Sequence, residues 1–214
     1  MNDKFFALPD EKQYAIINAG YRVFSQNSYK KSPMSEIAAE AGISKSLLFH
    51  YFKNKKELYM FLWHKCAQIS IQYLKKCGCY EKTDLFDAMY SGMKAKIRII
   101  KSYPNIGNFV IRAYYEKNPE VCSEIQASYR KYAKMKSTGF WKNIDTDKFI
   151  DGVDVNMIYK EIYWASEGYL WEVFSKQLEY TIDVEKMEKE FEEMIKFWKK
   201  IYLKDGGANG SNKA

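Results

Sequence analysis

The sequence predicts an all-α fold, on three observations. Only four of the 214 residues are proline and eleven are glycine, too few for the frequent turns of a sandwich or barrel. Apolar residues recur at the three- and four-residue spacing of amphipathic helices, and no segment shows the alternation of a strand. The composition, 47% hydrophobic and 29% charged, is ordinary for a globular protein with a buried core.

Prolines mark where several of the predicted helices begin. Pro9, Pro33, Pro104 and Pro119 each stand at the start of a helical pattern, where the missing N–H of proline would be unpaired anyway. Ser44 is placed to cap a further helix. The predicted helices cover residues 9–26, 33–41, 44 onward, 55–76, 84–102, 104–116, 119–143, 155–176 and 184–203.

The last two predicted helices differ in how their apolar residues are arranged. Helix 184–203 carries one stripe, formed by Val184, Met187, Phe191, Met194, Ile195, Trp198, Ile201 and Tyr202. Helix 155–176 is apolar on two sides, which indicates burial on more than one side. The polar tail, residues 205–214, has nothing to bury and is predicted to be disordered.

The segment from residue 32 to 58 points to a function. A short helix with one apolar face ends at Gly42, where a left-handed turn is easy for glycine. Ser44 then starts a second helix, whose Leu48 and Phe52 face inward. Two short helices joined by a glycine-containing turn make a helix-turn-helix, which places its second helix in the major groove of DNA.

This segment resembles the TetR family of transcriptional repressors. The family pattern runs I-A-x-x-A-G-V-S-x-G-T-L-Y-x-Y-F-x-x-K-x-x-L. The chain reads Ile37-Ala38-x-x-Ala41-Gly42-Ile43-Ser44-x-Ser46-Leu47-Leu48-Phe49-x-Tyr51-Phe52-x-x-Lys55-x-x-Leu58. The resemblance implies a three-helix DNA-binding domain at 1–54, a larger helical domain at 55–204 that binds an effector and dimerises, and the tail at 205–214.

The resemblance also assigns roles on double-stranded operator DNA. The residues expected to face bases are Ser35, Lys45, Ser46, Leu47 and His50, and those expected to hold phosphates are Ser44, Tyr51 and Lys55. Leu47 stands where the family often has threonine, and it can contact only a thymine methyl. Phe49 replaces the usual tyrosine and fits either a base contact or half-buried core.

The charge distribution agrees with a nucleic-acid partner. The net charge is +7, and residues 26–56 carry six lysines against two glutamates. A basic surface attracts anions such as nucleic acid. As an alternative, Lys53, Lys55 and Lys56 form only a solvated turn and His50 is only a surface histidine.

An effector pocket is implied by the resemblance, and the sequence offers an aromatic-rich candidate lining. Its residues are Tyr114, Tyr115, Phe140, Trp141, Tyr163, Trp164, Glu167 and Trp171. Aromatic faces with a few carboxylates suit flat, apolar or cationic ligands. The same residues at helical spacing also fit an ordinary core.

One recognition helix reads few bases, so helix-turn-helix proteins bind as dimers to half-sites about 34–36 Å apart. The last two helices are the predicted homodimer surface. The alternative is that their apolar stripe packs within its own subunit. The effector is expected to favour a dimer conformation that does not match the operator, and so to release a repressor from DNA. Helix 55–76 is the expected lever between the effector and the DNA-binding residues.

Other classes of protein have less support in the sequence. The chain has two histidines and shows no metal-spaced carboxylates, Gly-rich phosphate loop or Ser-His-Asp set, so we predict no enzyme, metal or cofactor. The pair Cys77 and Cys79 lacks a second close pair, and we interpret the cysteines as reduced cytoplasmic thiols. No apolar stretch is long enough for a membrane helix. A helical small-molecule carrier or interaction protein with a decayed DNA-binding motif is the alternative function.

Overall fold

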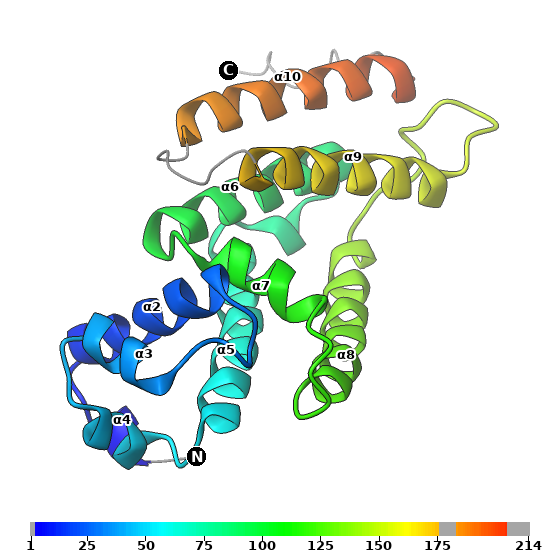
Figure 1. Cartoon of the computed structure of the whole chain (residues 1–214). Coiled ribbons are helices and arrows are strands. Elements are labelled where there is room, and N and C mark those ends of the chain that lie inside the picture. Colours follow the sequence, from blue (N-terminus) through cyan, green and yellow to red (C-terminus); the bar gives the residue numbers. More distant parts are fainter. Residues whose placement is uncertain (1–2, 176–182, 205–214) are drawn as a thin grey trace. The chain divides into compact units, whose positions relative to one another are not determined.

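The computed structural model describes residues 3–175 and 183–204 (Figure 1), apart from the side chains of residues 136, 137, 174 and 175. Its elements are α1 (Asp3–Phe6), α2 (Asp10–Gln26), α3 (Met34–Glu40), α4 (Lys45–Tyr51), α5 (Lys55–Lys76), η1 (Cys79–Glu81), α6 (Leu85–Ser102), α7 (Ile106–Tyr114), α8 (Cys122–Trp141), α9 (Val155–Ser175) and α10 (Val184–Tyr202). Within these described residues the one β-type pairing is an isolated bridge between Phe149 and Leu203. The predicted all-α fold is confirmed.

The helix boundaries follow the local sequence closely. Pro9 and Pro33 are the N-caps of α2 and α3, with extended ψ angles of 145° and 142°. They therefore precede the first helical turn instead of lying in it as predicted. The sequence did not predict α1 and η1, which are single turns too short for periodicity to reveal. The tail at 205–214 lies outside the described residues.

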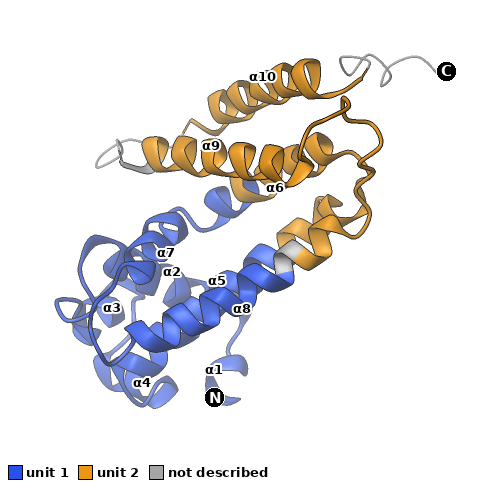
Figure 2. Ribbon diagram, turned by 90° about the vertical axis from the view of Figure 1, so that its right-hand side faces the viewer, with its two compact units in different colours: residues 1–72, 98–136 blue, residues 73–97, 137–214 orange. Residues whose placement is uncertain are grey.

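The chain divides into two compact units (Figure 2). Unit 1 comprises residues 1–72 and 98–136, and unit 2 comprises residues 73–97 and 137–214. The boundary predicted at residue 54 is a functional one, between DNA binding and effector binding, and it stays a prediction.

An aromatic cluster forms the centre of unit 1. Phe109 of α7 lies 5.2 Å from Tyr21 and 6.2 Å from Phe24 of α2, measured between ring centroids. Tyr59 of α5 lies 4.7 Å from Phe24 and 5.3 Å from Phe109. All four side chains are buried. Such edge and tilted pairs stabilise a core beyond the area they bury, so α2, α5 and α7 form one packed body.

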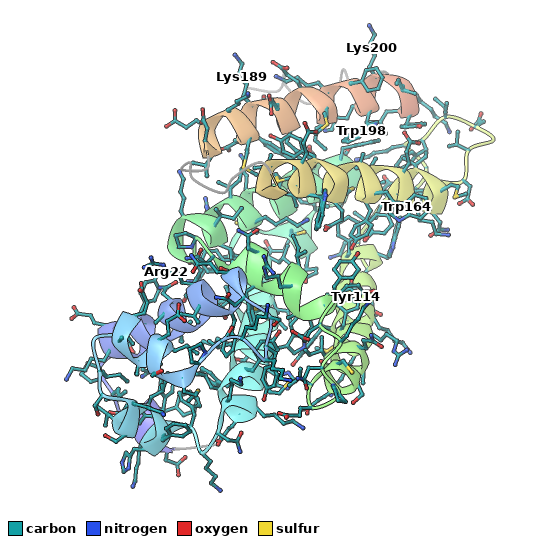
Figure 3. The ribbon with its side chains drawn as sticks, viewed as in Figure 1. Arg22, Tyr114, Trp164, Lys189, Trp198 and Lys200 are labelled. Atoms are coloured by element: carbon teal, nitrogen blue, oxygen red, sulfur yellow. The ribbon has the colours of Figure 1, made fainter. Side chains whose placement is uncertain are left out.

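Unit 2 contains α9 and α10 side by side and antiparallel, as Figures 1 and 2 show. The hydroxyl of Tyr169 donates to Glu190 at 2.7 Å, and the hydroxyl of Tyr202 donates to Glu161 at 2.7 Å. Trp198 of α10 is 6% exposed and lies on the side toward α9, whereas Lys189 and Lys200 are exposed on the other side (Figure 3).

Candidate nucleic-acid interface

A glycine turn joins α3 to α4. Gly42 has a φ of 67°, in the left-handed region that side chains rarely adopt. A Cβ added there would meet nothing within 4 Å, so the position requires glycine for its backbone conformation and not for space. Ile37 of α3 and Leu48 of α4 are both fully buried. These inner faces fix the two short helices as the predicted helix-turn-helix.

Ser44 sets the start of α4. It is the N-cap, with an extended ψ of 150°, and its side chain accepts a hydrogen bond from the backbone N–H of Leu47. Its Oγ also lies 2.9 Å from Oγ of Ser46. The cap predicted from the sequence is therefore confirmed, and it orients the residues expected to face bases.

The outer face of α4 is open. The predicted DNA contacts that the structure places on the surface are Ser35, Ser44, Lys45, Ser46, Leu47, Phe49 and His50. Leu47 is 37% exposed and Phe49 is 38% exposed, so neither belongs to the core. The ammonium of Lys45 lies 6.0 Å from the ring centroid of Phe49. Leu48 and Phe52 are buried as predicted.

Tyr51 differs from the other predicted contacts. It is 8% exposed, and its ring centroid lies 6.2 Å from that of Phe5 in α1. Phe5 is itself 1% exposed and packs on Phe52 and Phe61, with centroid distances of 5.1 and 5.2 Å. The sequence analysis missed this aromatic support for α4, although an adjacent Phe5-Phe6 pair near the start of the chain was a signal for it.

Lys55 lies where α5 begins. Its ammonium donates to the carbonyl of Lys30 at 3.2 Å and lies 4.7 Å from the ring centroid of Tyr29. Asn54 Oδ1 accepts the backbone N–H of Glu57 at 2.8 Å and so supports the first turn of the helix. Lys55 is thus held in place beside Tyr29. A lysine in a fully solvated turn would lack these two contacts.

The predicted effector residues fall into separate groups. In unit 1, Tyr114 and Tyr115 lie 5.1 Å apart, and Tyr114 lies 4.7 Å from Tyr129. In unit 2, Tyr159 lies between Phe140, Trp141 and Tyr163, with centroid distances of 5.3, 5.0 and 6.1 Å. The sequence did not indicate Tyr159 as a member of this group. Burial is the main cause that raises the pKa of its hydroxyl.

The remaining predicted pocket residues lie on α9. Glu167 pairs with Lys96 at 2.8 Å, while Trp164 and Trp171 are 64% and 53% exposed. Of the predicted pocket residues, Phe140, Trp141 and Tyr163 are the ones that form the aromatic cluster around Tyr159 in unit 2. The effector pocket itself stays a prediction.

The cysteines and acidic side chains of the described residues can be compared with the pattern of a metal site. In the part of the chain that the structure describes, no three His, Cys, Asp or Glu side chains are grouped to hold a metal ion. Cys79 is 3% exposed and donates to the carbonyl of Ala88 at 3.2 Å, and burial raises its pKa to about 11. Among the described residues, no helix has both the length and the apolar character needed to cross a membrane.

Residues 16–60 match the family model for "Bacterial regulatory proteins, tetR family". The chain is 21% identical over 152 residues to the fatty acid metabolism regulator protein of Bacillus subtilis, covering 71% of this chain and 78% of that protein. It is 39% identical over 119 residues to the HTH-type transcriptional activator FasR of Mycolicibacterium smegmatis, covering 56% and 54%. It is 25% identical over 126 residues to the HTH-type transcriptional regulator RutR of Escherichia coli K12, covering 59% and 58%. The chain therefore spans little more than half the length of the last two.

Solved structures share the fold. A TetR family transcriptional regulator from Chloroflexus aurantiacus has a TM-score of 0.58 at 18% identity, covering 95% of this chain and 98% of that one. The regulator FadR from Bacillus subtilis in complex with stearoyl-CoA has a TM-score of 0.52 at 20% identity, covering 85% and 96%. The helix-turn-helix and these likenesses define a DNA-binding transcriptional regulator. The family match over residues 16–60, the relatives and the solved structures together support a regulator of the TetR family.

Proposed function

We propose that this chain is a repressor that binds a palindromic operator as a homodimer and is released by a small apolar or aromatic effector. The observation that carries the proposal is the outer face of α4, where Lys45, Ser46 and His50 are exposed beside two apolar side chains. A helix with such a face suits the major groove, where donors, acceptors and thymine methyls distinguish the base pairs. The intact face also disfavours a carrier with a decayed motif.

Five of the predicted contacts have distinct roles in this proposal. Lys45 and His50 donate hydrogen bonds to base edges, and Leu47 packs on a thymine methyl. Phosphate contacts by Lys55 and Ser44 fix the register of the protein on the duplex. The hydrogen bond of Lys55 to the Lys30 carbonyl supports a role in which its charge is held near the start of α5.

Dimerisation through α9 and α10 completes the operator-binding form. Met157, Trp164 and Trp171 recur every seven residues on α9 and are 56%, 64% and 53% exposed. Phe197 and Ile201 of α10 are 61% and 42% exposed. Large exposed apolar side chains in a row mark interaction surfaces. A second copy of the chain would bury them in a four-helix bundle with two-fold symmetry.

The effector is proposed to be apolar. The cluster of Phe140, Trp141, Tyr159 and Tyr163 offers stacked and tilted ring faces. Two comparisons, both with a Bacillus subtilis regulator, favour an acyl chain. The relative is named as a fatty acid metabolism regulator, and the solved structure of FadR contains stearoyl-CoA. A lipophilic aromatic cation is the second class to test, because aromatic faces also attract cations.

Release is a population shift between two dimer conformations. The effector lowers operator affinity by no more than its own preference for the conformation that does not fit the operator, typically about 1–3 kcal/mol. We propose α5 as the lever, since it begins at Lys55 and continues to Lys76.

Selection of bound fragments from sheared genomic DNA of the source organism tests the proposal. It is carried out at two salt concentrations with the wild-type chain, with Lys55→Ala, and with Lys189→Ala as a control of equal charge. We expect one short palindromic site, lost with Lys55→Ala and retained with Lys189→Ala. Recovery of only sequence-blind DNA, or of none, would overturn the proposal.

The effector is tested on that site with two probes, stearoyl-CoA and tetraphenylphosphonium. At a saturating concentration, as judged by calorimetry, at least one is expected to release the operator. A probe that binds the chain and leaves operator affinity unchanged at saturation would contradict the release mechanism for its class.

A further inference from the structure

Tyr29, which lies between α2 and α3, is held by two acidic side chains from the segment that joins α7 to α8. Its backbone N–H donates to Glu116 Oε2 at 2.8 Å, and its hydroxyl donates to Glu120 Oε2 at 2.8 Å. The residue is 3% exposed. We call Tyr29, Glu116 and Glu120 the Tyr29 clamp. All three belong to unit 1, so the clamp lies within one compact body.

Glu116 also organises its own loop, which joins α7 to α8. Its second oxygen, Oε1, accepts the backbone N–H groups of Lys117 at 3.0 Å and Asn118 at 2.9 Å. Asn118 Oδ1 in turn accepts the backbone N–H of Glu120 at 3.0 Å. One carboxylate therefore accepts three backbone donors from two segments far apart in the sequence. Hydrogen bonds to a charged acceptor are stronger than neutral ones, which makes this a firm junction.

The other side of Tyr29 faces α5. Its ring centroid lies 5.0 Å from that of Tyr59 in an edge-to-face pair, and the ammonium of Lys55 lies 4.7 Å from the Tyr29 ring. Burial and then the hydrogen bond to Glu120 raise the pKa of the Tyr29 hydroxyl, so it stays protonated and able to donate. The Tyr29 clamp therefore holds the aromatic ring that the Lys55 ammonium contacts.

The loop end of the clamp continues directly into exposed aromatic residues. Tyr114 and Tyr115 precede Glu116 in the chain and are 38% and 68% exposed. The clamp thus lies next to an exposed aromatic pair in the chain.

We propose that Glu116 and Glu120 are positioning residues, which act through Tyr29 to hold Lys55 and the α2–α3 segment in the arrangement that binds DNA. This inference rests on the proposed function, since Lys55 is one of its phosphate contacts. It gives the effector-binding part of the chain a second connection to the DNA-binding residues, besides the proposed lever α5.

The test compares three variants of the full chain, Glu116→Gln, Glu120→Gln and Tyr29→Phe, with Glu124→Gln as the matched control. Glu124 is a carboxylate on α8 that pairs with Lys56 at 3.4 Å and forms no hydrogen bond with Tyr29. Each variant is first shown to be folded by circular dichroism. Its affinity for the selected operator is then measured over a range of salt concentrations.

The direction of the change in operator affinity distinguishes a positioning role of a glutamate from the effect of its charge alone. Removing a negative charge from a DNA-binding protein strengthens its attraction to phosphates, so Glu124→Gln is expected to bind equally well or more tightly. Loss of the clamp is expected to weaken binding about threefold to tenfold. The slope of log Kd against log salt should stay unchanged, because no phosphate contact is removed outright.

A double-mutant cycle isolates the hydroxyl–carboxylate contact. Tyr29→Phe combined with Glu120→Gln should weaken operator binding no more than Tyr29→Phe alone. The change to glutamine replaces a charged acceptor by a neutral one and so only weakens the hydrogen bond that the loss of the hydroxyl already removes. Tyr29→Phe combined with Glu124→Gln should be additive. Additive losses in the first pair, or unchanged affinity in all three clamp variants, would overturn the proposal.

Hydrogen exchange on the DNA-free chain tests the clamp even if no operator is recovered. Glu116→Gln is expected to raise exchange in residues 28–33 and also in residues 53–58, whereas Glu124→Gln leaves residues 28–33 unchanged. Faster exchange confined to the α7–α8 loop would overturn the positioning role. Recovery of no operator together with the expected exchange pattern would count against the proposed function alone.

Discussion

The hydroxyl of Ser44 accepts a hydrogen bond from the backbone N–H of Leu47, with an N···O distance of 3.1 Å. This contact fixes the first turn of α4, which is only seven residues long. A helix that short has little stability of its own and depends on its cap and on packing. The same serine that stabilises α4 therefore also orients its exposed face.

Changing the cap separates its structural role from its electrostatic one. Ser44→Ala is expected to lower the free energy of unfolding by about 1 kcal/mol, because one N–H at the start of α4 loses its partner. Ser44→Asp restores a capping oxygen and should recover that stability. It should nevertheless bind operator weakly, since a carboxylate faces the phosphates. Urea unfolding and operator affinity together check this, and full DNA binding by Ser44→Asp would contradict a DNA-facing Ser44.

We expect the operator affinity to depend on a thymine methyl group that Leu47 contacts. Replacing the contacted thymine with uracil removes one methyl, which is expected to cost about 0.8 kcal/mol, or about fourfold in Kd. Uracil scanning across the selected half-site identifies that position. In Leu47→Ala the same substitution should have no further effect. Equal sensitivity to uracil in the wild type and the variant would show that Leu47 does not read that base.

The exposed tryptophans of α9 predict the oligomeric state. Trp164→Glu combined with Trp171→Glu places two charges in the proposed interface, and sedimentation equilibrium should then report a monomer. Met135→Glu on α8 is the control, because Met135 is 53% exposed but lies on another helix. It should remain a dimer. A dimeric Trp164→Glu, Trp171→Glu variant would place the interface elsewhere.

The turn between α3 and α4 predicts a backbone effect at Gly42. Gly42→Ala forces a side chain into the left-handed region and should destabilise the chain by about 1–2 kcal/mol. Gly92→Ala in α6 is the control, since its added Cβ would meet its nearest atoms at 3.8 and 3.9 Å, an ordinary contact distance. It should be neutral or slightly stabilising in a helix. Thermal unfolding distinguishes the two, and equal melting temperatures would argue against strain at residue 42.

Cys79 predicts a loss of stability at alkaline pH. Burial raises its pKa in the folded chain to about 11 from an ordinary value of 9.0. Below pH 9 both states keep the proton, whereas between pH 9 and 11 only the unfolded state releases it, so stability falls as pH rises. Cys79→Ser does not titrate there and should lose less stability over that window. Parallel urea-unfolding profiles for the two proteins would contradict the shift.

The local features of the fold could be predicted from the sequence because they depend on neighbouring residues. The prolines and the apolar spacing located α2 to α10 to within a few residues, and Gly42 and Ser44 identified the helix-turn-helix. The exposed face of α4 followed from the same periodicity, which left Leu48 and Phe52 inside.

Features made by distant segments could not be predicted in this way. Tyr51 is buried because Phe5, far away in the sequence, packs against it. Lys55 rests on Tyr29, whose partners Glu116 and Glu120 lie about ninety residues further along the chain. The predicted effector residues are distributed over both units, and periodicity alone does not say which of them meet.

The central claim is that α4 reads sequence while lysines around it hold phosphates, and fluorescence anisotropy tests it most directly. Kd is measured at several salt concentrations for the selected site and for a scrambled duplex of the same composition. We predict parallel salt dependences, with the selected site bound at least about a thousandfold more tightly throughout. Equal Kd values for the two duplexes at every salt concentration would contradict the claim.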